Sequence, residues 1–107
     1  MSEIVILDSD RGKTFEAHVG DLIAIRLAEN PTTGYLWEIS GFDNQLVEFQ
    51  GSDYSVAPRT SIGGGGTRIF RFRAKSTGTG QIQLRRRRSW ESETRAIEQF
   101  TVNIQVQ

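Results

Sequence analysis

Residues 100–106 read Phe-Thr-Val-Asn-Ile-Gln-Val, and apolar and polar side chains alternate along the whole stretch. Successive side chains of a β-strand point to opposite faces of a sheet, so this stretch predicts a strand with one buried and one exposed face. The same alternation recurs in shorter runs, whereas no window of about eleven residues carries the apolar stripe of an amphipathic helix. The chain is therefore expected to be all-β.

Eight stretches have strand character: residues 3–7, 14–18, 22–28, 35–40, 46–56, 67–75, 81–88 and 95–106. A chain of 107 residues can bury one hydrophobic core and is too short for two. About seven to eight short strands in such a chain favour an immunoglobulin-like antiparallel β-sandwich, with a small closed barrel as the rival architecture. We therefore expect residues 1–107 to form a single domain.

The composition narrows the classes of function. The chain holds no cysteine, a single histidine and no Gly-x-Ser-x-Gly elbow, so neither a thiol nucleophile nor a serine triad is indicated. The stretch from Asp8 to Gly12 is similar to the start of a calcium loop, but Val19 stands where such a loop has its bidentate glutamate. No enzymatic activity, metal or cofactor is expected.

Basic residues concentrate in residues 67–90, where Arg85 to Arg88 form an unbroken run and no acidic residue occurs. Such a run is compatible with nucleic-acid binding. However, successive residues of a strand divide between two faces, no aromatic RNA-binding signature accompanies the run, and the net charge is zero. Ion-paired or solvated arginines are the favoured interpretation, and no nucleic-acid partner is expected.

The first residues give an expectation about location. Ile4 to Leu7 is the apolar run nearest the N-terminus, and it is too short for a signal peptide or a membrane segment. We therefore expect no membrane partner. The predicted location is cytoplasmic for the chain as written, and periplasmic or secreted for a chain from which a leader has been removed.

If each strand crosses the sandwich once, successive connections fall alternately at its two ends. One set of connections consists of ordinary turn residues, at 20–21, 41–45 and 76–80. The other set holds both prolines, a run of four glycines and a tryptophan in a polar context, at 29–34, 57–66 and 89–94. Binding residues concentrate in loops on a rigid scaffold, so function is expected at the end formed by the second set.

The three loops of the second set differ in character. The loop Asn30-Pro31-Thr32-Thr33-Gly34 should be stiff, because proline fixes φ and β-branched threonines restrict χ1, while Gly34 permits a positive φ on exit. Gly63 to Gly66 leads into a strand, which favours a loop that becomes ordered on a partner over a phosphate-binding loop. Trp90 is interpreted as exposed for recognition, and Trp37 as a core residue.

Together these loops resemble those of the chagasin family of cysteine-peptidase inhibitors, which carry an Asn-Pro-Thr-Thr-Gly-aromatic loop, a Gly-rich loop and an Arg-Pro-Trp loop. The corresponding stretches are residues 30–35, 63–67 and 88–91. The resemblance spans about residues 21–107 and depends on the order and spacing of all three motifs. Ser89 replaces the family's proline, which predicts a looser third loop.

The resemblance implies a sandwich that inhibits papain-like cysteine peptidases tightly and reversibly by inserting three loops into the active-site cleft. Thr32 and Thr33 would lie nearest the peptidase's catalytic cysteine, with the glycines on one side and Trp90 on the other. The implied partner-binding residues are Asn30, Pro31, Thr32, Thr33, Gly34, Tyr35, Gly63, Gly64, Gly65, Gly66, Thr67, Arg88, Ser89 and Trp90. The free inhibitor is expected to be a monomer. The alternative is an immunoglobulin-like protein-binding or adhesion module whose partner is not a peptidase.

Overall fold

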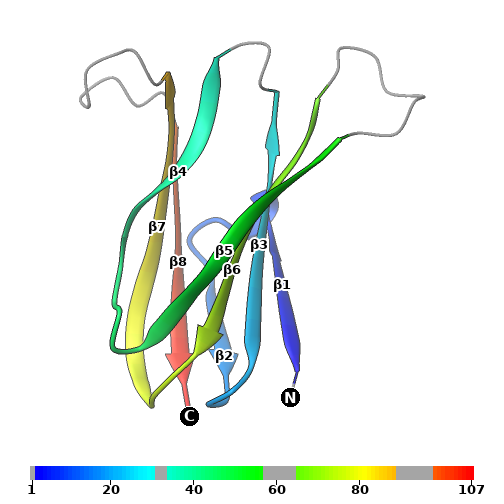
Figure 1. Cartoon of the computed structure of the whole chain (residues 1–107). Helices are drawn as coiled ribbons and strands as arrows, with labels where there is room; N and C mark the ends of the chain where they lie inside the picture. Colours follow the sequence, from blue (N-terminus) through cyan, green and yellow to red (C-terminus); the bar gives the residue numbers. More distant parts are fainter. Residues whose placement is uncertain (1, 31–33, 57–64, 89–97) are drawn as a thin grey trace.

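The computed structural model describes residues 2–30, 34–56, 65–88 and 98–107. These residues form eight strands in two four-stranded sheets that face each other (Figure 1). Sheet 1 has the order β1 (Glu3–Leu7), β3 (Leu22–Glu29), β6 (Gly66–Ala74) and β5 (Val47–Val56). Sheet 2 has the order β2 (Thr14–Ala17), β8 (Glu98–Val106), β7 (Gly78–Arg88) and β4 (Tyr35–Phe42). The predicted all-β sandwich is confirmed.

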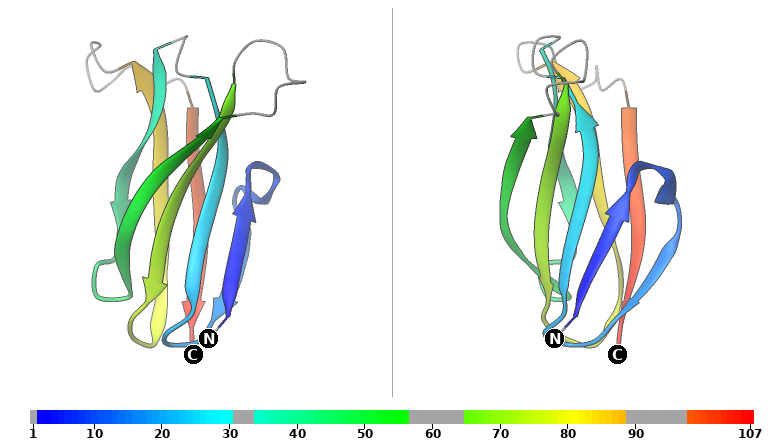
Figure 2. Two further views of the ribbon diagram at one scale, coloured as in Figure 1. Left: turned by 45° about the vertical axis from the view of Figure 1, so that its right-hand side comes forward. Right: turned by 90° about the vertical axis from the view of Figure 1, so that its right-hand side faces the viewer.

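Two of the strand pairings differ from the antiparallel arrangement expected from the sequence. Strand β1 runs parallel to β3, and β2 runs parallel to β8, whereas the other four pairings are antiparallel. The chain leaves β1 through a short 3-10 helix, η1 (Asp8–Asp10), and turns back into β2 on the other sheet (Figure 2). Neither strand is joined to its sheet neighbour by a hairpin, so nothing requires the pair to be antiparallel.

The core lies between the sheets and follows the predicted alternation. On β8, every second side chain is apolar and buried, namely Phe100, Val102, Ile104 and Val106. The residues between them face outward. Phe72 of β6 is fully buried, and its ring centroid lies 5.3 Å from that of Phe42 and 5.4 Å from that of Phe49. Trp37 is only 6% exposed, which confirms its prediction as a core residue. This apolar burial is the main stabilising contribution to the fold.

The connections alternate between the two ends of the sandwich as expected (Figure 1). Strands β3, β5 and β7 end, and strands β4, β6 and β8 begin, at what we call the loop end. Residues 18–21, 43–46 and 75–77 connect strands at the opposite end, the turn end, where both termini also lie (Figure 2). In the described part of the chain, no helix is long and apolar enough to cross a membrane.

Candidate functional site

Half of the predicted partner-binding residues belong to the described part of the chain, and these all lie at the loop end: Asn30, Gly34, Tyr35, Gly65, Gly66, Thr67 and Arg88. The other predicted residues lie outside the described residues: Pro31, Thr32, Thr33, Gly63, Gly64, Ser89 and Trp90. The structure therefore brings the edges of the three loops to one end of the sandwich, and the binding roles of the residues stay predictions.

Strand pairing places the loop edges side by side. In sheet 1, Gly66 lies opposite both Glu29 and Val56, so the first and second loops leave neighbouring strand ends. In sheet 2, Tyr35 lies opposite Arg88, so the first and third loops do the same. The edges of the first loop, one in each sheet, are therefore paired with an edge of the second loop in sheet 1 and of the third loop in sheet 2.

Two glycines of the predicted site have structural reasons to be glycine. Gly34 has a φ of +81°, a left-handed conformation that side chains disfavour, and this confirms the positive φ expected at the exit of the first loop. Gly66 leaves no room for a side chain, because a Cβ atom would lie 2.6 Å from Oη and 2.7 Å from Cζ of Tyr54. Close packing against Tyr54 thus accounts for Gly66.

Beneath the loops, the space between the sheets changes from apolar to charged. On β3, the buried series Ile23, Ile25, Leu27 continues into Glu29, whose side chain is fully buried. On β6, the buried series of phenylalanines continues toward the loops into Arg68, which is 23% exposed. We call the following residues the charged layer: Glu29, Trp37, Tyr54, Arg68, Arg86 and Glu98.

Glu29 connects three strands of the charged layer. Its Oε1 accepts a hydrogen bond of 2.7 Å from the backbone N–H of Trp37 on β4. Its Oε2 accepts a hydrogen bond of 3.0 Å from Nε of Arg68 on β6 and lies 2.9 Å from Nη2 of the same side chain. The indole Nε1 of Trp37 also donates to the carbonyl of Ala28, at 2.9 Å. A buried carboxylate is tolerated when it is paired and hydrogen-bonded in this way.

Arg86 connects the charged layer to the third loop. Its guanidinium carbon lies 5.5 Å from the ring centroid of Trp37, within the range of a cation–π contact. Its Nη2 lies 2.7 Å from Oε1 of Glu98, the first residue of β8. The other oxygen of Glu98 accepts a hydrogen bond of 2.6 Å from Nη2 of Arg11. Through these contacts, one connected set of side chains links the strands that flank all three loops.

The run of arginines divides between the two faces of sheet 2, as the sequence predicts. Arg86 and Arg88 lie on the inner face of the sheet. The guanidinium carbon of Arg88 lies 4.4 Å from the ring centroid of Tyr35. Arg85 and Arg87 face outward, where the Nε atoms of both bond Oε2 of Glu38, at 2.5 and 2.8 Å. The predicted ion-paired interpretation is therefore confirmed for this outer pair.

The same contacts set the pKa of Glu38. Burial alone would raise the pKa of Glu38, but the hydrogen bonds from Arg87 and Arg85 outweigh it and hold the pKa below its ordinary value. The carboxylate is therefore ionised at neutral pH, with both arginines as partners. This outer ion cluster is a second anchor between β4 and β7, separate from the charged layer inside the sandwich.

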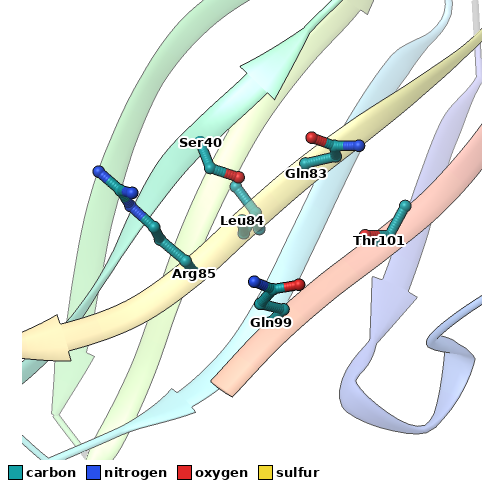
Figure 3. A pocket seen from close by; sticks show the side chains of 6 residues that line it. All are labelled: Ser40, Gln83, Leu84, Arg85, Gln99 and Thr101. Carbon is teal, nitrogen blue, oxygen red and sulfur yellow. The ribbon is translucent and has the colours of Figure 1, made fainter. Parts of the chain in front are cut away.

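A polar hollow of about 260 Å³ lies on sheet 2 (Figure 3). It is lined by residues of β4, β7 and β8: Ser40, Gln83, Leu84, Arg85, Gln99 and Thr101. Ser40 is the extra residue of a β-bulge opposite β7, and Arg85 is already paired with Glu38. Amide and hydroxyl groups dominate the lining, so it offers no acid–base pair for catalysis. Within the described residues, no group of three potential metal ligands occurs.

The charged layer was missed by sequence reasoning, although a signal for it exists. Glu29 has the same parity as the buried residues of β3, and Arg68 has the same parity as Phe70 and Phe72 of β6. Opposite charges on the buried faces of two predicted strands indicate a buried ion pair.

The sequence resembles one family of known proteins along most of its length. Residues 16–104 match the model of the family described as Chagasin family peptidase inhibitor I42. Chagasin of Trypanosoma cruzi is 30% identical to this chain over 101 residues, which cover 91% of this chain and 92% of that protein.

Solved structures share the fold. A cysteine protease inhibitor from Entamoeba histolytica, EhICP2, superimposes with a TM-score of 0.90 over 100% of this chain and 97% of that chain, at 23% identity. PbICP-C, solved in complex with falcipain-2, covers 100% of both chains with a TM-score of 0.64, at 16% identity. At these identities the likeness concerns the fold, and it agrees with the two-sheet sandwich described above.

Proposed function

Because this chain belongs to the chagasin family of peptidase inhibitors, we propose that its loop end enters the active-site cleft of a papain-like cysteine peptidase and blocks it reversibly. The observation that carries the proposal is the convergence of three loop edges at one end of the sandwich, next to each other in both sheets. A relative of the same fold, PbICP-C, has been solved in complex with falcipain-2.

The structure beneath the loops suits a loop end that is inserted into a cleft. Binding costs entropy when loops must be ordered, and a rigid, preorganised base lowers that cost. Here the loop edges are held by strand pairing and by the hydrogen bonds of Glu29, rather than by apolar packing alone. The loop end is therefore expected to meet the cleft with the edges of its three loops already placed relative to each other.

Within this proposal, each loop has its own task. Thr32 and Thr33 lie nearest the peptidase's catalytic cysteine, the glycine run lines the cleft on one side, and Trp90 packs on the other. Tryptophan is among the residues most enriched at interface hot spots, because it buries a large area with few rotatable bonds. Gly66 supports the second loop from below through its packing against Tyr54.

The proposal includes no catalysis by the inhibitor itself, because steric blockage needs no reactive group. His18, the histidine of the chain, lies at the turn end with a side chain that is 76% exposed. The hollow on sheet 2 is lined by amides, hydroxyls and an arginine that is already paired. Neither feature supplies a nucleophile beside a base.

The proposal is tested by titrating papain with the purified protein. At an enzyme concentration well above the dissociation constant, activity should fall linearly and vanish near equimolar inhibitor. Activity should return on dilution, and mass spectrometry should find the inhibitor uncleaved. If several papain-like enzymes keep full activity at excess protein, the proposal fails, and the adhesion-module alternative becomes the better account.

A further inference from the structure

We propose that Glu29 is a positioning residue for inhibition, which together with Arg68 fixes the first and second loops relative to each other. The inference rests on the proposed function, and it adds a residue that lies outside the loops themselves. Glu29 is the last residue of β3, so its carboxylate stands where the chain leaves the sandwich for the first loop.

The carboxylate spans the base of two loops. Through Oε1 it holds the backbone N–H of Trp37, which lies shortly after the first loop returns to sheet 2. Through Oε2 it holds Arg68, which lies shortly after the second loop returns to sheet 1. The side chain of Glu29, at the end of β3, therefore connects the strand that precedes the first loop with β4, which follows the first loop, and with β6, which follows the second.

The chemistry of the position supports positioning over stability. An apolar side chain at a buried site can match or exceed the stability of an ion pair, because desolvation of the charges costs free energy. Apolar packing is non-directional, however, whereas charge-assisted hydrogen bonds fix both distance and angle. A carboxylate with both oxygens occupied is thus suited to holding strand ends in one arrangement.

Trp37 extends the effect to the third loop. The ring that Glu29 positions through its backbone bond also lies 5.5 Å beneath the guanidinium of Arg86, and Arg86 pairs with Glu98 at the start of β8. A change at Glu29 is therefore expected to disturb the first and second loops most and the third loop less.

The test uses Glu29→Gln, which keeps side-chain size and removes the negative charge, and Arg68→Gln, which shortens the side chain and removes the positive charge of the pair. The matched control is Glu38→Gln, which removes a carboxylate that is likewise bonded to arginine, in this case to two guanidinium groups on the outer face of sheet 2. The inhibition constant for papain is measured on protein shown to be folded at the assay temperature by circular dichroism. We expect a rise of roughly tenfold for each test variant, the loss of one charge-assisted contact, and less than about twofold for the control.

The double variant Glu29→Gln/Arg68→Gln separates positioning by the pair from general weakening. If the two residues act as one unit, the double variant inhibits about as well as either single variant, because the same contact is lost once. If the two losses simply multiply, or if the test variants inhibit as well as the unchanged protein, the inference is wrong.

A second readout keeps this inference separate from the proposed function. Amide hydrogen exchange needs no peptidase. In Glu29→Gln it should accelerate at Trp37, whose N–H donates to the carboxylate, while Ala74 at the turn end, whose N–H donates to the carbonyl of Asp21, keeps its protection. If the unchanged protein fails to inhibit, the proposed function falls, and this pattern still shows whether Glu29 holds the loop edges. If exchange at the amide of Trp37 stays unchanged, the positioning role is refuted whatever the inhibition data show.

Discussion

The two ends of the sandwich are held by different kinds of contact. At the turn end, backbone groups bond each other across the connections: the N–H of Gly20 donates to the carbonyl of Ala74 at 2.9 Å, and the N–H of Lys75 donates to that of Leu46 at 2.8 Å. The interior there is apolar as far as Ala17, Ala74 and Val47, and the buried carboxylate of Asp21 accepts hydrogen bonds from the backbone N–H groups of Ser2 and His18. At the loop end, the charged layer takes the place of apolar side chains.

This difference separates stability from shape. Apolar burial contributes most of the free energy of folding, but it does not specify angles. Side-chain hydrogen bonds and ion pairs contribute less net free energy and specify geometry more strictly. Apolar packing toward the turn end thus contributes most to the free energy of unfolding, and the charged layer holds the loop edges in place. Mutations in the apolar part should mainly lower stability, and mutations at the loop end should mainly lower affinity for the peptidase.

The largest expected effect is on folding. Phe72→Ala removes a fully buried ring that contacts Phe42 and Phe49, so it should lower the free energy of unfolding by about 3–5 kcal/mol. Urea denaturation measures this loss. The fraction that remains folded should inhibit with an unchanged constant, and a large loss of affinity per folded molecule would contradict the division between the apolar part and the loop end.

The opposite pattern is expected for Trp90→Ala, in the predicted third loop. Loss of a hot-spot tryptophan should cost about 2 kcal/mol or more of binding free energy. The urea midpoint should stay close to that of the unchanged protein, since the proposed role of Trp90 is contact with the partner. An unchanged inhibition constant would exclude Trp90 as an anchor of the interface.

Gly66→Ala should affect both measurements, because it lies on the border between scaffold and loop. The added methyl group would collide with Tyr54 and with the carbonyl of Ser55, so β5 and β6 must move apart at the base of the second loop. We expect a loss of about 1–3 kcal/mol in unfolding free energy. Affinity should fall as well. Gly65→Ala is the matched control for the unfolding free energy, since a Cβ atom there lies 3.9 Å from its nearest neighbour, the carbonyl of Glu29.

The smallest expected effect concerns pH. The pKa of Glu38 in the folded protein lies below its ordinary value of 4.5, so its contribution to stability is complete above that value and is lost as the pH falls through the folded pKa. The side chain is 37% exposed, so screening by water keeps this contribution below about 1 kcal/mol. Urea midpoints between about pH 6 and pH 3 should fall less for Glu38→Gln than for the unchanged protein, and equal slopes would contradict the assignment.

Much of the scaffold could be predicted because its information is local. Alternation along Phe100 to Val106 specifies a strand and its buried face, and the alternation of connections between the two ends follows from counting strands. Strand direction is not local, since a period of two is the same in parallel and antiparallel sheets. This is why the parallel pairing of β1 with β3 and of β2 with β8 was not foreseen.

The candidate site was predictable to a different degree. Motif order indicated which loops share an end, and strand pairing now places their edges side by side. The sequence could also have indicated that Glu29 is buried, because it follows Leu27 at the correct parity. It could not indicate its partner, since Arg68 and Arg86 both continue buried series and only the distances between strands decide which arginine reaches the carboxylate.

The most direct test of the account is to map which backbone amides respond to a bound peptidase. Amide chemical shifts of the labelled protein are measured by NMR with and without papain whose catalytic cysteine is replaced by alanine. The account predicts that Gly34, Gly65 and Arg88, one at the edge of each loop, shift together at the same molar ratio, while Gly20 and Asn44 at the turn end do not. Shifts confined to the turn end, or to the outer face of either sheet, would contradict it.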